Sequence, residues 1–324
     1  MKDLVNSSKK YLKNLKSKNV LDIGCNDGTL LSLFKKEGCK TFGVEPTRAA
    51  VEAKKKGHVI FKEYFDKTSS KNIRKIIGNI DIITFTNVFA HIEDLEDLLF
   101  SLKNISNKNT LIIIENHYLG EVIKKTQFDT FYHEHPRTYS LKSFVNISKK
   151  ININLIDYKF VKRYNGNIRV YLKSFGKIYK SKKKLNQSLR LEKLEINKIK
   201  TFQKKVNKWK LNKKKEIEKI TEKFGPLPAK AFPGRASISI NLLRLNSQHI
   251  SKVYEKNSSL KVNKFIPGTD IKILKEKFFK VKQYDNGILI NLAWHISDEI
   301  NNYLRRKMKF KGKIIDIISN RDFK

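Results

Sequence analysis

Short apolar runs alternate with longer helix-like stretches along the first half of the chain, and this alternation restricts the folds open to it. Runs with the length and composition of buried strands lie at residues 20–23, 41–44, 80–84 and 110–114. The segments between them have helical patterns. Strands that alternate with helices are typical of a parallel sheet with crossover helices. We therefore predict an α/β fold for the first part of the chain.

The rest of the chain continues this organisation after an interruption. Residues 153–161 and 167–172 bracket a turn at Tyr164-Asn165-Gly166, which predicts an antiparallel hairpin at the edge of the sheet. A long basic stretch with apolar residues at helical spacing follows and is stopped by a Gly-Pro-Leu-Pro segment at 225–228. Strand-like runs then recur at 229–232, 250–254, 287–292 and 313–318.

This pattern predicts a first domain at 1–175, a basic helical connector at 176–224 and a smaller α/β domain at 225–324.

The charge of the chain is strongly positive, with 69 Lys and Arg against 31 Asp and Glu and a formal net charge of +38. Only 11 of the basic residues are arginine. The lysines accompany abundant asparagine and isoleucine, which also have A/T-rich codons, so genome composition explains the bias. We find no aromatic RNA-binding motif and no zinc-finger spacing. We therefore expect no nucleic-acid partner, although a basic surface suits a phosphorylated small molecule.

The sequence argues against a membrane-spanning or secreted protein. No apolar run approaches the ~20 residues that span a membrane, and the N-terminus has no signal-peptide pattern. We predict a cytoplasmic protein, either a monomer or a weak oligomer. The two cysteines, Cys25 and Cys39, are too few for a four-thiolate metal site, so we expect inert thiols and no bound metal.

A strand, a glycine turn and a helix follow one another at residues 20–31. Gly24 and Gly28 allow the backbone to approach a ligand closely. Glu45 follows the next strand, where a carboxylate accepts hydrogen bonds from both hydroxyls of a ribose, and Asn87 follows the third. The alternatives are a ligand-free α/β domain with a tight glycine turn and a nicotinamide enzyme, for which the glycine spacing is wrong.

These residues resemble the cofactor site of class I S-adenosylmethionine-dependent methyltransferases. The resemblance implies that Asp22, Gly24 and Gly28, with Asn26 of the same loop, bind the amino-acid end of S-adenosylmethionine. It also implies that Glu45 binds the ribose. Asn87 is a further predicted cofactor contact.

Two histidines, a glutamate and a tyrosine occupy the four consecutive positions 132–135. Packing and solubility do not require such a cluster, whereas proton transfer does, because histidine titrates near neutral pH and a carboxylate can orient it. A His-Glu-His metal site is an alternative, but the spacing differs from that of HExxH helices.

This segment resembles the sugar C-methyltransferases that act on nucleotide-linked 4-keto-6-deoxy hexoses, and the resemblance covers nearly the whole chain. The matching segments, in chain order, are NVFAH at 87–91, ENHYLG at 115–120, QFDTFYHEH at 127–135, GNIRVY at 166–171, FPGRA at 232–236, PGT at 267–269 and AWHISDEI at 293–300.

The resemblance implies a mechanism in which the acceptor carbon is first deprotonated. It makes His135 the base at carbon 3 of the sugar and makes Tyr132 the residue that hydrogen-bonds the carbon-4 oxygen. Glu134 and His91 would orient the base. Substrate contacts are predicted for Asn116, His117, Arg169 and Arg235.

Each assignment has a structural alternative. His133 could face the sheet, His91 could be a surface residue, and Asn116 and His117 could hydrogen-bond backbone. Arg169 could be a surface charge. Arg235 could pair with a carboxylate of its own domain.

The chain departs from the resembling family in two places. An N-terminal module that binds zinc through four cysteines is expected in that family, and no such segment precedes residue 19, so we predict no zinc. The turn at 232–234 also differs from the family's usual turn. A methyltransferase acting at oxygen or nitrogen, or a non-catalytic binding protein, therefore stays open as an alternative.

Overall fold

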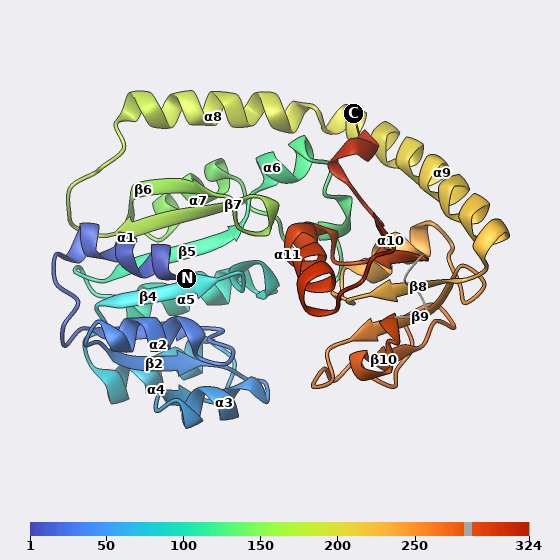
Figure 1. Ribbon diagram of the computed structural model, residues 1–324. Helices are drawn as coiled ribbons and strands as arrows, with labels where there is room; N and C mark the ends of the chain where they lie inside the picture. Colours follow the sequence, from blue (N-terminus) through green and yellow to red (C-terminus); the bar gives the residue numbers. More distant parts are fainter. Residues whose placement is uncertain (282–286, 324) are drawn as a thin grey trace. The chain divides into compact units, whose positions relative to one another are not determined.

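The structure, a computed structural model, describes residues 1–281 and 287–323 and divides into two compact units. The first unit comprises Met1–Glu121 and His133–Leu194, and the second comprises Val122–Tyr132 and Glu195–Lys324. A short internal segment of the first half of the sequence therefore belongs to the second unit. Figure 1 shows the elements of both units.

Within the described residues, the first unit contains one sheet with the strand order β3-β2-β1-β4-β5-β7-β6. The strands are β1 (Asn19–Ile23), β2 (Lys40–Val44), β3 (Val59–Phe61), β4 (Ile82–Thr86), β5 (Leu111–His117), β6 (Asn154–Val161) and β7 (Asn167–Lys173). β1 to β5 pair in parallel, whereas β7 runs antiparallel to both β5 and β6. The predicted fold class and edge hairpin are confirmed. β4 begins two residues later than predicted, and the three-residue β3 was not predicted.

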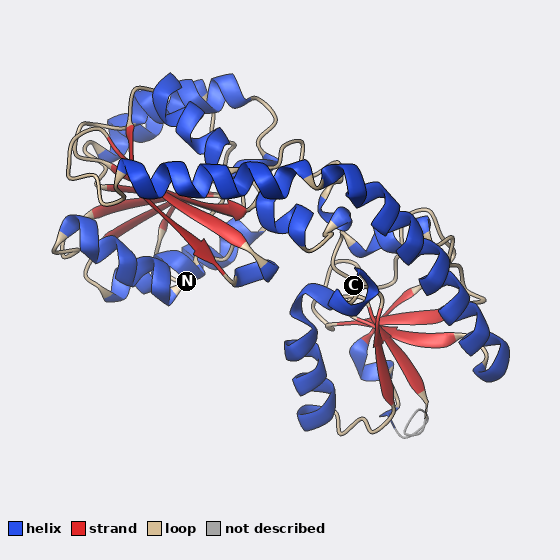
Figure 2. Cartoon of the chain, turned by 90° about the horizontal axis from the view of Figure 1, so that it is seen from above, coloured by secondary structure: helices blue, strands red, loops and turns tan. Residues whose placement is uncertain are grey.

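Helices cover both faces of this sheet (Figure 2). On one face lie α1 (Lys2–Leu12), α2 (Thr29–Lys36) and α3 (Ala49–Lys55), and on the other lie α4 (Lys67–Ile77), α5 (Leu95–Ile105) and α7 (Leu141–Lys150). The short α6 (Leu119–Lys124) follows β5. Neighbouring strand residues alternate between the two cores: Val20 packs with the first set and Leu21 with the second. Because both faces are buried, the strands read as continuous apolar runs.

The long basic stretch forms two helices, α8 (Lys182–Asn197) and α9 (Ile199–Phe224), separated at Lys198. The boundary between the compact units falls inside α8, after Leu194. Glu192 of α8 is 3% exposed and its carboxylate accepts the backbone N–H groups of Leu141 (2.5 Å) and Lys142 (2.9 Å). These donors lie in the first turn of α7, where N–H groups have no partner within the helix. Glu192 therefore attaches α8 to the first unit.

The second unit has a parallel sheet whose order in the described residues is β10-β9-β8-β11-β12. Its strands are β8 (Leu227–Lys230), β9 (Ile250–Glu255), β10 (Ile273–Lys275), β11 (Ile288–Asn291) and β12 (Lys313–Asp316), and its helices include α10 (Ala236–Leu242) and α11 (Ser297–Asn302). Val206 and Trp209 of α9 lie in the same core as Ile240 and Ile290. A second α/β region is present, as the predicted fold class requires, but the second unit also includes residues 122–132 and 195–224, outside the predicted bounds of 225–324. β10 was not predicted.

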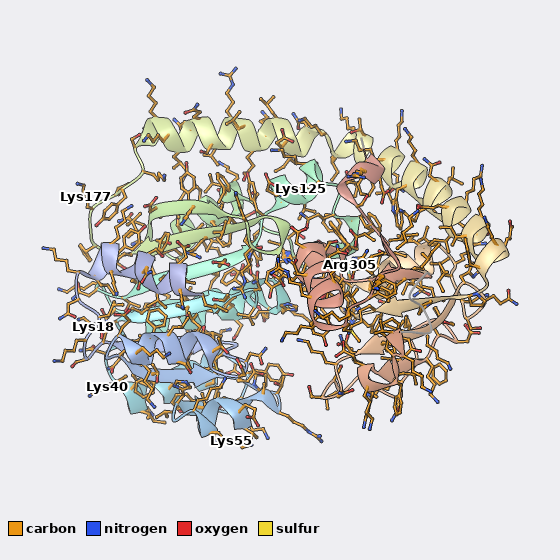
Figure 3. The ribbon with its side chains drawn as sticks, in the orientation of Figure 1. Lys18, Lys40, Lys55, Lys125, Lys177 and Arg305 are labelled. Carbon is orange, nitrogen blue, oxygen red and sulfur yellow. The ribbon has the colours of Figure 1, made fainter. Side chains whose placement is uncertain are left out.

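Basic side chains are spread over the surface. Lys40, Lys55 and Lys177 are exposed and point away from the ribbon of the first unit (Figure 3). Both cysteines are buried, and burial raises the pKa of the Cys39 thiol to about 11. In the part of the chain that the structure describes, no helix is both long enough and apolar enough to cross a bilayer.

The Glu192 contact predicts a measurable loss of stability. Glu192→Ala leaves two N–H groups of α7 without their acceptor, so we expect the free energy of unfolding to fall by about 1–3 kcal/mol. Urea denaturation measures it. Glu52→Ala is the control, because it removes only an exposed ion pair with Lys55 and should cost under about 1 kcal/mol. Equal losses in the two variants would contradict the attachment of α8 through Glu192.

Candidate active site

The strand order reverses direction at β1, which lies between β2 and β4. The chain first builds the sheet outward through β2 and β3 and then continues from β4 on the other side. Open α/β sheets bind ligands at such a reversal, beyond the carboxyl ends of the strands. The loops after β1, β2 and β4 carry Asn26, Glu45 and Asn87, so the predicted cofactor residues meet at this edge.

The loop after β1 requires glycine at two positions. Gly24 has φ +69° and Gly28 has φ +72°, a conformation that other residues adopt at a cost. A Cβ atom on Gly24 would lie 2.5 Å from Cγ2 of Val88, and one on Gly28 would lie 2.7 Å from the ring of His58. The side chains of Val88 and His58 therefore leave no room for a Cβ atom at these two positions.

Glu45 is 6% exposed and is oriented by backbone donors of two loops. The N–H of Asn26 donates to Oε2 (2.9 Å), and the N–H of Thr47 donates to Oε1 (3.0 Å). Each carboxylate oxygen has a second lone pair with which it can accept another donor. The side chain is thus fixed in place with acceptor capacity left.

Asp22 lies on β1 beneath the glycine loop and is 3% exposed. Burial raises the pKa of its carboxyl to about 7, and the negative charge of Glu45 acts in the same direction. The hydroxyl of Thr84 donates to Oδ1 at 2.6 Å and opposes the rise. Near neutral pH this carboxyl is therefore close to its point of half-ionisation.

Asn87 follows β4 in a left-handed conformation, with φ +54°. Its N–H donates to the carbonyl of Glu115 (2.8 Å), and its Oδ1 accepts the side-chain amide of Asn167 (2.9 Å). Asn167 begins β7 and is fully buried. The antiparallel hairpin thus reaches across β5 to position the loop that follows β4, a link that the sequence did not indicate.

Three imidazole rings converge beside these loops. The ring centroid of His135 lies 4.6 Å from that of His91 and 5.5 Å from that of His117. His91 ends the 3₁₀ turn η1 (Phe89–His91) after β4, and His117 ends β5. The structure therefore brings His91 to His135, as the sequence analysis expects. It also brings His117 there, and His117 in turn stacks on Tyr164, which was not predicted as a site residue.

The other members of the 132–135 run differ in their surroundings. Tyr132 is half-buried and belongs to the second unit, whereas the three residues after it belong to the first. Glu134 is exposed. The alternative that His133 faces the sheet is wrong, because its side chain is exposed.

Asn116 and Arg169 are buried in contacts of the first unit. The Asn116 amide, oriented to satisfy both of its atoms, donates to the carbonyl of Glu115 and accepts the N–H of Ala90. These are the backbone bonds that the structural alternative expected. Arg169 is 2% exposed, so the alternative of a surface charge is wrong. Its Nε donates to Glu115 (2.7 Å) and its Nη1 to Asp3 (2.8 Å).

Arg235 pairs with a carboxylate of its own unit. Its Nε and Nη2 donate to the two oxygens of Asp129 at 2.8 and 2.6 Å, and Nε1 of Trp294 donates to the same carboxylate at 2.7 Å. Asp129 is fully buried. The alternative of an internal ion pair therefore describes this arginine, and a contact between Arg235 and substrate stays a prediction.

In residues 1–281 and 287–323, no group of three or more His, Cys, Asp and Glu side chains is arranged to bind a metal ion.

Two family models match the chain in succession. A methyltransferase domain matches residues 2–158, and a C-methyltransferase C-terminal domain matches residues 163–318. The C-methyltransferase NovU of Streptomyces niveus is 29% identical over 153 residues, which cover 47% of this chain and 36% of the relative. The chain thus matches little more than a third of that protein's length.

Solved structures also resemble part of the chain. The magnesium protoporphyrin IX methyltransferase ChlM of Synechocystis PCC 6803 covers 53% of this chain and 82% of its own, with 15% identity and a TM-score of 0.43. An S-adenosylmethionine-dependent methyltransferase of Clostridium acetobutylicum ATCC 824 covers 54% of this chain and 91% of its own, also at 15% identity and a TM-score of 0.43.

The raised pKa of Asp22 predicts an unusual pH dependence. Between pH 3.8 and about 7 the unfolded chain ionises this carboxyl while the native state keeps the proton, so stability falls as the pH rises. The free energy of unfolding of Asp22→Asn should therefore exceed that of the wild type by a growing margin, up to a few kcal/mol, as the pH rises across this range. Urea denaturation at several pH values measures the difference. Asp27→Asn is the control, because Lys56 lowers the pKa of Asp27 and its contribution has the opposite sign. A difference between Asp22→Asn and wild type that is constant with pH would contradict the assignment.

The buried ion pair in the second unit predicts a large effect of removing one partner. Asp129→Asn leaves the Arg235 guanidinium buried without its counter-charge, which costs about 3–5 kcal/mol of unfolding free energy. Thermal denaturation measures the loss. Asp298→Asn, on the exposed start of α11, should cost under about 1 kcal/mol. The double variant Asp129→Asn/Arg235→Met should recover part of the loss, and no recovery would contradict the unpaired-charge explanation.

Proposed function

Because the chain belongs to the C-methyltransferase family, with a methyltransferase domain followed by a C-methyltransferase C-terminal domain, we propose that it transfers a methyl group from S-adenosylmethionine to a carbon atom of a small acceptor. The observation that carries the proposal is the position of the histidines. His91 follows β4 and His117 ends β5, at the same sheet edge as the glycine loop, and both rings contact that of His135. This supports a proposed base close to the proposed cofactor loop.

The residues at this edge fit S-adenosylmethionine. The left-handed Gly24 allows the backbone to approach the amino-acid part of the cofactor, and Glu45 has acceptor capacity for the ribose hydroxyls. Asn26 and Asn87 follow β1 and β4 at the same edge, and Asp22 lies on β1 just before the loop. When bound, the cofactor supplies an electrophilic methyl group on a sulfonium.

A base is needed because an ordinary C–H carbon is not a nucleophile. A neighbouring ketone acidifies the C–H bond, so that a ring nitrogen of His135 can take the proton while the bonding electrons form an enolate. The enolate carbon then forms the new C–C bond as the bond between methyl and sulfur breaks. Tyr132 is proposed to donate to the enolate oxygen, because negative charge develops there.

Two imidazole rings are neighbours of the His135 ring. His91 contacts its ring edge to face, with an interplanar angle of 68°, and His117 lies on another side. Glu134, adjacent in sequence, is proposed to orient the imidazole and to set its tautomer.

We further propose that the acceptor is a nucleotide-linked 4-keto-6-deoxy hexose. A ketone next to the methylated carbon is what the proposed chemistry requires, and a net charge of +38 favours an acceptor that carries a diphosphate. The half-buried His117 is a proposed sugar contact. Asn116 and Arg169 are already engaged within the first unit, so their proposed contribution is to shape the site. A contact of Arg235 with the substrate is proposed separately, because its guanidinium already pairs with Asp129 in the second unit.

The central test separates proton removal from methyl transfer. A nucleotide 4-keto-6-deoxy hexose in deuterated buffer should exchange the proton at carbon 3, with and without S-adenosylmethionine. His135→Asn should slow this exchange by about 10²–10⁴-fold and leave the affinity for S-adenosylmethionine unchanged. Nuclear magnetic resonance follows the exchange, and calorimetry measures the affinity.

His133→Asn is the matched control, because it alters an exposed histidine two positions away and should exchange at the wild-type rate. If His135→Asn keeps more than about a tenth of the wild-type rate, His135 is not the base. If no keto-sugar exchanges with the wild type, the proposed acceptor class is wrong.

A further inference from the structure

The turn between β6 and β7 contains a residue in an unfavourable backbone conformation. Tyr164, in the 3₁₀ turn η3 (Arg163–Asn165), has φ +48° and ψ +37°. The left-handed region costs a residue with a Cβ about 1–2 kcal/mol relative to the right-handed one. Such strain persists only where the surroundings enforce it, and it is common at functional sites.

Packing on both sides of Tyr164 enforces this conformation. Gly166 has φ +138°, and a Cβ atom there would lie 2.6 Å from Cβ of Glu121, so the turn lies tightly against the start of α6. On the other side, the Arg163 guanidinium lies 4.8 Å from the centroid of the Tyr164 ring. Nη1 of the same arginine is 3.7 Å from the buried carboxylate of Glu115.

The strained turn presents the Tyr164 ring to His117. The two rings are stacked, with a centroid distance of 5.9 Å and an interplanar angle of 16°. His117 is opposite Asn167 in the β5–β7 pairing, so its backbone is fixed by the sheet and the orientation of its ring depends on such contacts. On its other side the His117 ring contacts His135, which in turn contacts His91, so the four rings form a row.

We propose that Tyr164 is a positioning residue, which supports the His117 ring and through it orients the His135 imidazole. This inference rests on the proposed function, in which His135 is the base. A base must point at the proton it removes, and small errors of orientation cost rate rather than binding. Tyr164 has the geometry for this role, because its ring stacks on that of His117.

Several titratable groups lie around His135. His91 faces it from η1 and His117 from β5, and Glu134 precedes it in the chain. Arg163 and Glu115 form the outer end of the row beside Tyr164. Because the three rings are in contact, a change in the position of one ring alters the surroundings of the next.

The test compares Tyr164→Phe, which keeps the ring, with Tyr164→Ala, which removes it. Tyr64→Ala is the control, since that tyrosine is 77% exposed in the same unit. We expect Tyr164→Ala to lower kcat for carbon-3 exchange by roughly 10–100-fold, with the affinity for S-adenosylmethionine and the KM of the sugar within about twofold of wild type. Tyr164→Phe and Tyr64→Ala should behave like the wild type.

A second measurement needs neither substrate nor activity. The chain has seven histidines, so a spectrum of histidine-labelled protein can be assigned by single substitutions. We expect Tyr164→Ala to move the resonances of both His117 and His135 and to alter their titration, whereas Tyr164→Phe preserves them. Movement of His117 alone, with His135 unchanged, would overturn the inference. If both resonances move but the wild type exchanges no sugar, the proposed function fails while the positioning contact stands.

Discussion

The buried ion pair between Glu115 and Arg169 is the contact on which the arrangement of the site depends. The two residues lie opposite each other on β5 and β7, and both are at most 2% exposed. A buried charge without its partner is costly, so a register shift that separated Glu115 from Arg169 would be strongly unfavourable. The same register places the next two residues of β5, Asn116 and His117, opposite Ile168 and Asn167. The hairpin also brings Asn167 to Asn87.

The sequence was sufficient where local patterns determine structure. Four strands are buried on both faces and read as continuous apolar runs, namely β1, β2, β4 and β5. The glycines after β1 indicate a turn with left-handed residues. Strands β3 and β10 have three residues each, too few for a period of two to be distinguished from a loop.

The contacts of the site were less predictable because they join distant residues. Arg235 and Asp129 are 106 residues apart, and nothing near either one indicates whether the arginine meets a carboxylate or a diphosphate. His91 was expected beside His135 only from a family resemblance. Tyr164 has no local signal except its place in a turn, because its role depends on how β7 pairs with β5.

The strained turn at Tyr164 has a consequence for directed evolution of this chain. Glycine at this position would adopt the left-handed conformation without cost, so selection for thermal stability alone would favour replacement of Tyr164 by glycine. The ring that supports His117 would disappear with it. Libraries screened for heat resistance should therefore enrich a more robust but slower protein, and the tyrosine would persist only where turnover is selected as well.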